Sequence, residues 1–444
     1  SVKMGWSSFT ADWIASFGKI FVNLLKLIAL PLVLFSVIGG ITGIGDPEHL
    51  GKMGFKTLGL YLVTTIIAVS LGLVLVNTIK PGNSLDETVR LENRIDYELW
   101  AKAEGIPLKD DLCYSCKEEN KTLVIEVSKK MELVEMSSSD STRLYTAKKT
   151  INAGPLQPLV DVVPKNIFST LFSGDMLPVI FFAIFFGISV LYIPKKQSII
   201  IIDFVNATNE VFLKMIDFIM RASPFFVFAL MAGLITSMAG DDLEKMANIF
   251  AGLFKYSMVV VLGLGIMAFG FYPLLMKLFS GQYRYSEFFR KIAPAQMLAF
   301  STSSSAATLP VTIECVEENL KIDKRISGFV LPIGATVNMD GTSLYQAVAA
   351  IFLAQMFMVD LTLGQQLTIV ITATLASIGS AAVPSAGLVM LMIVLSSVGL
   401  NPAWIAFVLP VDRLLDMCRT TVNVTGDVTI CTLIAKSEET NIPV

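Results

Sequence analysis

Apolar residues fill this chain in long runs, and polar residues are confined to short breaks and one long insert. The uninterrupted runs cover roughly 18–44, 55–79, 168–194, 199–236 and 247–279. Each is long enough to cross the hydrocarbon layer of a bilayer, which takes about 20 residues of α-helix. The later chain, 285–440, is apolar too but is repeatedly interrupted. The pattern predicts an all-α membrane protein built as a multi-span bundle.

A polar insert, residues 81–164, separates the second and third runs. Within it, 121–127 and 131–136 alternate apolar with polar residues, which predicts a small β-hairpin outside the bilayer. Lysine and arginine concentrate in alternate connections, and we expect those loops on the cytoplasmic side. The insert then lies outside. The N-terminal residues lie outside as well, so an earlier spanning helix is expected to be missing.

Composition agrees with a membrane protein. Of 444 residues, 54% are hydrophobic and 16% are charged, whereas charged residues make up ~25% of an ordinary soluble domain. The net charge of -3 argues against nucleic acid as a partner, because nucleic-acid binding calls for clustered basic surface. We expect a multi-pass protein of a plasma membrane or bacterial inner membrane, surrounded by lipid. Cys113 and Cys116 form a CxxC pair in the insert, which fits either a disulfide or a loose metal site.

Two later segments are too short and too broken to cross the bilayer. In each, two apolar arms of ~10 to 15 residues flank a tip rich in small residues, and such an arm spans only ~15 to 22 Å. The tips are 301–310, with the sequence STSSSAATLP, and 376–387, with the sequence ASIGSAAVPSAG. Two interrupted segments in corresponding places predict re-entrant hairpins in an inverted repeat, with a binding site between the tips.

A polar ladder follows the second hairpin, in the sequence DRLLDMCRTTVNVTGD. On a helix, one face within roughly a 100° arc carries its polar members: Asp412, Asp416, Arg419, Thr420, Asn423 and Asp427. Charges in such an apolar segment need partners or a water-filled cavity. The ladder is therefore either an internal ion-pair network or a site for a charged solute and its counter-ions.

The residue types of the ladder describe an acidic amino acid as the solute. Arg419 offers a planar fork that can hold a carboxylate bidentately. Asp416, one turn away, can hold an ammonium group. Ser305 and the N–H groups of the first hairpin can take a second carboxylate.

Hard oxygen ligands for a cation gather in the same region. A helix that follows the first hairpin has a polar centre at Asn338, Asp340 and Gly341, and unwinding at Gly341 would turn backbone carbonyls inward. Those carbonyls, with Asp340, Asp427, Asn338 and Asn423, would suit Na⁺ rather than a soft metal.

Four motifs together resemble those of the glutamate transporter family, the dicarboxylate/amino acid:cation symporters. They are SSSAATLP, NMDGT followed by Tyr345 and Gln346, SIGSAAVPSAG and DMCRTTVNVTGD. The resemblance covers nearly the whole chain. It implies a homotrimer in which a transport domain slides as an elevator against a trimerisation scaffold, with the second hairpin as the outer gate. It also implies a side conductance for chloride.

The resemblance divides the chain into six parts. These are a scaffold helix within 1–54, a transport-domain helix at 55–80, the extracellular insert 81–164, scaffold helices at 165–240, a transport-domain helix at 241–283 and the transport core 284–440.

The resemblance also implies residue roles. Arg419 would bind the side-chain carboxylate of L-aspartate or L-glutamate and Asp416 the amino group, with the rest of the substrate site made by Thr342, Thr420, Asn423, Ser304, Ser305, Val383 and Gly387. One Na⁺ site would use Asp427, Gly334, Asn338 and Asn423; a second Thr336, Ser377, Ile378 and Ser380; a third Asp340, Asn338, Tyr61, Thr64 and Thr65. Na⁺ is thus the expected co-transported ion.

The chain departs from the family pattern at several positions. Gln346 stands where mammalian glutamate carriers have a glutamate linked to proton coupling. Ser303 and Met417 occupy the two positions at which an extra arginine is found, and Arg413 is a candidate to replace it. Proton and potassium coupling therefore do not follow from the resemblance.

Other functions compete with this one. A proton- or sodium-coupled carrier of four-carbon dicarboxylates would not need Asp416, and a neutral amino acid carrier would not need Arg419. A pure anion channel is a further alternative. An intramembrane serine hydrolase could use the serine-rich tip, but no GxSxG or Ser–Lys pairing is present. We therefore expect a carrier and no enzyme.

Overall fold

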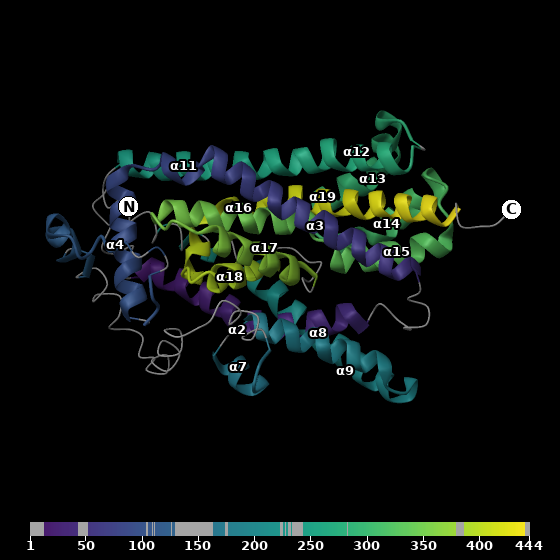
Figure 1. Ribbon diagram of the computed structural model, residues 1–444, viewed down its shortest axis with the longest axis horizontal. Helices are drawn as coiled ribbons and strands as arrows, with labels where there is room; N and C mark the ends of the chain where they lie inside the picture. Colours follow the sequence, from purple (N-terminus) through teal and green to yellow (C-terminus); the bar gives the residue numbers. More distant parts are fainter. Residues whose placement is uncertain are drawn as a thin grey trace.

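The computed structural model describes residues 13–42, 52–128, 163–232, 243–378 and 386–439, apart from short gaps at 104, 109, 111, 126, 174–175, 223–224, 227, 230–231 and 282. All regular elements in these ranges are helical, as the apolar runs predicted. In Figure 1 most of the long helices lie roughly along the long axis of the molecule.

One group of helices packs together on one side of the molecule. It comprises α2 (Ala15–Thr42), α8 (Met176–Tyr192) and α9 (Lys195–Arg221), preceded by the short α7 (Ile167–Ser173). α2 packs along both α8 and α9, and all three lie below the other long helices in Figure 1. Their shared core also contacts Ala376, Met390 and Ile393 from the second group.

The second group surrounds α16 (Asp340–Met356), whose side chains are almost all buried. α3 (Lys52–Ile79) packs along it, as do α11 (Leu243–Gly265), α17 (Leu363–Ile378), α18 (Ala386–Ser397) and α19 (Ile405–Glu439). α11 continues through a π-helical segment (Ile266–Phe271) into α12 (Tyr272–Phe279). By length and composition, Met53–Ser84 and Ala247–Phe279 are the two helices in the described ranges that could each cross a membrane.

The serine-rich segment folds as a tight helical pair. α13 (Tyr285–Thr302) ends at Ser303, which adopts the left-handed conformation with φ 54°, and α14 (Ser305–Glu314) begins directly after Ser304. The Ser304 hydroxyl accepts a hydrogen bond from the Ala307 N–H at 3.2 Å and so caps α14. The two helices pack against each other and both contact α19.

The second interrupted segment forms α17 and α18, which also pack against each other. Its tip, including Ser380 and Val383, lies outside the described residues. The arms on both sides of the tip are helical.

The described part of the insert consists of helices joined by turns. α4 (Glu87–Ala103) is amphipathic, with buried residues at positions 89, 93–95, 97–98 and 101. The predicted β-hairpin is wrong over 121–125, which are helical. In a strand Ile125 and Val127 would share a face, but Ile125 is 55% exposed and Val127 only 5%. The partner stretch 131–136 lies outside the described residues.

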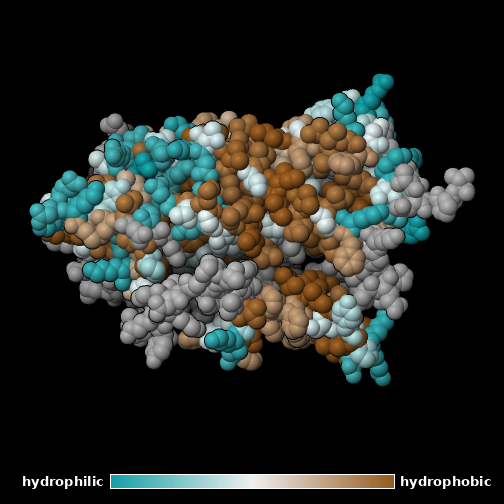
Figure 2. Space-filling view, viewed as in Figure 1, coloured by the Kyte–Doolittle hydropathy of each residue, from teal (hydrophilic) through white to brown (hydrophobic). Residues whose placement is uncertain are grey.

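A broad apolar band crosses the visible face of the molecule between two polar ends (Figure 2). Exposed Phe254, Phe269, Leu62 and Val74 contribute to the apolar surface of α3 and α11–α12. A surface apolar over the middle and polar at both ends fits a protein that lies across a bilayer.

Candidate functional site

The polar ladder lies on α19 and faces the interior. All its members are buried: Asp412, Asp416, Arg419, Thr420, Asn423 and Asp427. α19 packs against α13, α15 (Lys324–Val337) and α16, and the ladder side chains contact α16 and the end of α15. The helical period of 3.6 residues therefore places six polar side chains inside a helical core.

Arg419 is the centre of the ladder and is fully buried. Its Nη2 atom donates to Asp416 Oδ1 at 2.7 Å and lies 3.0 Å from Asp412 Oδ1. Its guanidinium carbon lies 3.9 Å from the centre of the Tyr345 ring, a cation–π contact. The Nε and Nη1 atoms have no hydrogen-bond partner among the described residues. Buried donors of this kind carry a desolvation cost unless something accepts from them.

Two further predicted residues lie beside this guanidinium. A Cβ atom at Gly387 would lie 3.3 Å from Arg419 Nη1 and 3.1 Å from Thr342 Cγ2. Helices α16 and α19 and the start of α18 therefore meet around the guanidinium. Asn423 Nδ2 lies 3.4 Å from Thr342 Oγ1, which joins the next turn of the ladder to the same place.

The helix break next to the ladder falls before Gly341. α15 ends at Val337 and α16 begins at Asp340, so Asn338 and Met339 are the two non-helical residues of the break. The predicted unwinding at Gly341 is wrong because Gly341 is already helical, and its N–H donates to Asn423 Oδ1 at 2.8 Å. A Cβ there would lie 2.6 Å from the Arg419 carbonyl oxygen. Gly341 thus allows two helices to approach closely.

Asp427 lies against the broken helix. Its Oδ1 accepts from Asn338 Nδ2 at 2.8 Å, and the same amide group lies 3.3 Å from the Asn423 carbonyl oxygen. Gly334 faces both Asp427 and the Tyr61 hydroxyl so closely that a Cβ would collide with them. Four predicted residues from α3, α15 and α19 are therefore brought together with the Asn423 backbone.

Asp340 lies on the other side of the break. Its Oδ1 accepts from Thr65 Oγ1 at 2.7 Å, and its Oδ2 accepts from the Tyr272 hydroxyl at 2.8 Å. Tyr272 comes from α12 and was not among the predicted residues. A single tyrosine in a long apolar run carries no signal in the sequence that separates it from a packing residue.

The remaining predicted ligands make local contacts. Hydroxyl groups bond to carbonyls of their own helices at Thr64, Thr336 and Ser377. Ile378 ends α17, and Ser305 begins α14 and is buried. Thr64 lies in the middle of α3, whereas the other four residues lie at or near helix ends, where backbone groups are unpaired.

Two residues outside the predicted substrate site, Tyr345 and Asp412, contact Arg419, and a third, Arg413, does not lie in the site. Tyr345 and Asp412 hold the Arg419 guanidinium, although neither was given a role; Tyr345 is three residues after Thr342 and so shares its face of α16. Arg413 is exposed and lies outside the ladder face, so it does not take the place of the extra arginine. Its side chain projects about 100° away from that of Asp412.

The charges of this region are unbalanced. Asp340 and Asp427 have hydroxyl and amide partners, and within the described ranges neither has a lysine or arginine at ion-pair distance. Around Arg419, two carboxylates face one guanidinium. Buried charges require compensation. In the described residues no three His, Cys, Asp or Glu side chains converge as a metal site, and the oxygen groups around Asp340 and Asp427 are of the kind that binds alkali cations.

Helical elements throughout the described ranges, an apolar band and a buried, charged ladder fit the class of membrane carriers for charged solutes. A model of the Sodium:dicarboxylate symporter family matches residues 2–437, and the chain belongs to this family. Membership makes it a sodium-coupled symporter of dicarboxylates or amino acids.

Several curated relatives are similar over most of the chain. Human excitatory amino acid transporter 2 is 38% identical over 415 residues, which cover 92% of this chain and 71% of the relative. Human excitatory amino acid transporter 3 is 38% identical over 418 residues, 92% of this chain and 76% of the relative. Excitatory amino acid transporter 1 of Ambystoma tigrinum is 36% identical over 418 residues, which cover 92% of this chain and 74% of the relative.

Proposed function

We propose that this protein drives the uptake of L-aspartate or L-glutamate with an inward Na⁺ gradient. The observation that carries the proposal is the state of Arg419. It is fully buried, two of its nitrogen atoms have no partner in the described residues, and two carboxylates flank it. An acidic amino acid supplies both a carboxylate for the unpaired N–H groups and an ammonium for the surplus negative charge.

The substrate roles follow from these groups. Arg419 Nε and Nη1 donate to the side-chain carboxylate, and Asp416 accepts from the ammonium group. Thr342 of α16 and Thr420 and Asn423 of α19 line the substrate site, and Gly387 of α18 lies beside them. The second carboxylate is held by N–H groups at the start of α14 near Ser304 and Ser305, because a helix N-terminus favours an anion. Val383 completes the site in this proposal.

The co-transported Na⁺ ions balance the remaining carboxylates. One ion is held by Asp427 with Asn338, Asn423 and carbonyl groups near Gly334. A second is held by Asp340 with Thr64, Thr65 and Tyr61, and a third by hairpin carbonyls at Ser377, Ile378 and Ser380 with Thr336. Binding of cations beside the ladder offsets buried negative charge, and this couples the ion sites to the substrate site.

Transport proceeds in this proposal as an elevator movement in a homotrimer. α2, α8 and α9 form the scaffold within 1–54 and 165–240, and they pack mainly with one another. The moving domain comprises 55–80, 241–283 and 284–440, with α13–α14 and α17–α18 as re-entrant hairpins. Backbone ends at membrane depth are tolerated where protein or a cavity covers them, which suits the start of α18 beside Arg419.

The decisive experiment uses purified protein in liposomes with an inward Na⁺ gradient. We expect accumulation of labelled aspartate that stops when Na⁺ is replaced by choline. Arg419→Ala should lose uptake of acidic substrates while the protein remains folded and inserted. Retained aspartate uptake in Arg419→Ala would contradict the proposed role. Voltage-clamp current without labelled uptake would indicate an anion channel instead.

A carrier of four-carbon dicarboxylates is the second candidate, because the family takes its name from dicarboxylate transport. Competition by aspartate, glutamate, serine and succinate separates the two. Asp416→Asn should weaken aspartate competition far more than succinate competition if Asp416 binds the ammonium group. Equal loss for both would favour the dicarboxylate carrier.

A further inference from the structure

Helix α4 of the insert lies across the ends of the helices that carry the candidate site. One face of it makes three backbone contacts: Arg90 Nη2 donates to Gln355 O at 3.0 Å, Arg94 Nη1 to Met358 O at 2.8 Å and the Tyr97 hydroxyl to Gly399 O at 3.3 Å. Positions 90, 94 and 97 share a face because they are four and three residues apart. The helix therefore binds backbone groups, not only side chains, of the second helix group.

Two of the three contacted residues belong to loops, and Gln355 lies in the last turn of α16. Met358 lies between α16 and α17, and Gly399 lies between α18 and α19. The loops also touch each other, since the rings of Phe357 and Trp404 stack with 3.6 Å between their centres. The Tyr97 ring of α4 lies next to them, with its centre 5.3 Å from that of the Trp404 ring. α4 thus connects the chain just before α17 with the chain just after α18, at the base of the α17–α18 pair.

Arg94 is the main link in this arrangement. It is fully buried and all three of its nitrogen atoms are bonded. Nε donates to Glu98 at 2.7 Å, the two Nη atoms donate to Asp110 at 2.6 and 2.8 Å, and further bonds go to the carbonyls of Leu112 and Met358. Bidentate bonds of this kind fix direction as well as distance. One side chain therefore joins α4, the turn after it and the α16–α17 loop.

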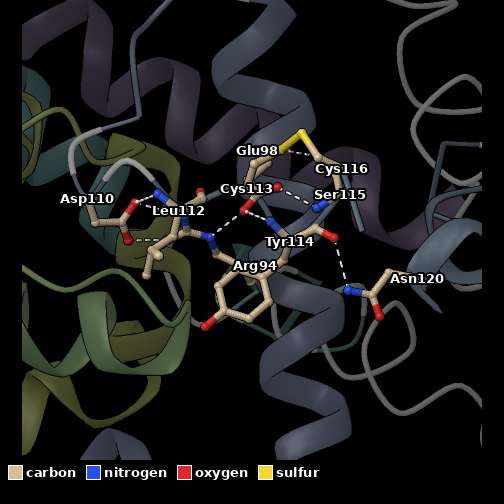
Figure 3. Close-up of a disulfide and its surroundings, with 9 residues drawn as sticks. All are labelled: Arg94, Glu98, Asp110, Leu112, Cys113, Tyr114, Ser115, Cys116 and Asn120. Carbon is tan, nitrogen blue, oxygen red and sulfur yellow. Dashed lines mark hydrogen bonds and ion pairs between the residues drawn. A yellow bond between two sulfur atoms is a disulfide. The ribbon is translucent and has the colours of Figure 1, made fainter. Parts of the chain in front are cut away.

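The Cys113–Cys116 disulfide closes the turn that holds this link (Figure 3). The N–H groups of Tyr114 and Ser115, inside the disulfide loop, donate to the Glu98 carboxylate at 2.9 and 2.7 Å. Glu98 in turn accepts from Arg94. The disulfide therefore orients two N–H groups, these fix Glu98, and Glu98 fixes Arg94.

Met358, which accepts the bond from Arg94, has an unusual backbone conformation. Its φ is 51°, a left-handed conformation that residues other than glycine rarely adopt. Its N–H donates to Gln355 O and that of Val359 donates to Ala354 O, the helix-ending pattern in which glycine is usual. An unfavourable conformation persists where neighbouring bonds hold it, and the bond from Arg94 is one of them.

We propose that Arg94 is a positioning residue that keeps the two ends of the α17–α18 pair joined, and that reduction of Cys113–Cys116 releases this brace. A dithiol reductant would attack the exposed Cys116 Sγ or its partner. The S–S bond then breaks, two cysteine thiols form with two protons, and the reductant leaves as a disulfide. Glu98 loses its oriented N–H donors, and Arg94 loses its fixed position.

Hydrogen–deuterium exchange on the protein in lipid nanodiscs tests the brace. After treatment with dithiothreitol, backbone amides in 357–362 and 398–404 should exchange roughly tenfold faster or more, since local opening sets their protection. Amides inside α16 should not change. Cys113→Ser with Cys116→Ser should give the same acceleration without reductant and no response to it.

Two variants make the test specific. Arg94→Lys keeps the charge but not the fork, so it should accelerate the same loops. Lys121→Ala removes an exposed ion pair with Glu118 in the same insert and should change nothing in these loops. The brace is refuted if reduction, checked by mass, frees 105–120 while 357–362 and 398–404 keep their protection. Exchange requires no substrate, so this result is independent of uptake.

Discussion

The Arg419 guanidinium lies over the ring of Tyr345, with 3.9 Å between the guanidinium carbon and the ring centre. The two residues come from α19 and α16, and both are fully buried. Stacking covers one face of the guanidinium, while Asp412 and Asp416 hold Nη2 at one edge. The contact therefore leaves Nε and Nη1 at the edges available to a ligand.

Replacing Tyr345 by leucine should raise the KM for aspartate by roughly 10- to 30-fold, because a desolvated cation–π contact is worth about 2 kcal/mol. Tyr345→Phe keeps the ring and should recover most of the affinity. Initial rates of labelled uptake in proteoliposomes give KM and Vmax separately. An unchanged KM in Tyr345→Leu would mean that the ring does not position Arg419.

Neutralising Asp340 or Asp427 should raise the Na⁺ concentration for half-maximal uptake by about tenfold or more. Each is a buried carboxylate with uncharged partners, and a cation is the group that would balance it. Uptake against Na⁺ concentration measures the effect for Asp340→Asn and Asp427→Asn. Asp323→Asn, at the exposed start of α15, serves as the control. The same Na⁺ dependence in all three variants would remove the assigned cation roles.

The helical period was enough to predict the ladder. Residues 412, 416, 419, 423 and 427 repeat at intervals of three or four, and the structure buries all of them on one face of α19. The interrupted segments were also visible, because small residues replace large apolar ones at their tips. Local pattern therefore predicted these helices and the buried face of α19.

The rest of the site depends on contacts between distant segments. Tyr272 reaches Asp340 across 68 positions, and nothing in its neighbours indicates that contact. Gly341 was interpreted as a point of unwinding, but its lack of a side chain serves close packing against Arg419. In the insert, alternation over a few residues did not distinguish a strand from a helical turn.

The contact between Arg94 and Asp110, which holds the turn after α4, should persist in mild acid and be lost only in strong acid. Burial acts to raise the Asp110 pKa, but hydrogen bonds from Arg94 and its charge outweigh burial and hold the pKa below its usual value. A carboxyl with a lowered pKa contributes stability above its unfolded pKa of about 3.9, and the contribution disappears as the pH falls through the folded pKa. Protection of 105–120 in pulse-labelled exchange should therefore be constant between about pH 8 and 5 and fall below about pH 4. In Asp110→Asn the protection of 105–120 should be lower at every pH. A fall in wild-type protection near pH 6 would contradict the lowered pKa of Asp110.

Replacing Met358 by glycine should stabilise the end of α16 by about 1 kcal/mol, because glycine adopts the left-handed conformation without the cost that a Cβ imposes. The side chain is only partly buried, so little packing is lost with it. The change should also make the loop less dependent on Arg94: Arg94→Lys should accelerate exchange in 357–362 less in the Met358→Gly background than in the wild type. A double-mutant cycle on exchange rates measures this coupling. Strictly additive effects would show that Arg94 and the conformation of Met358 are independent.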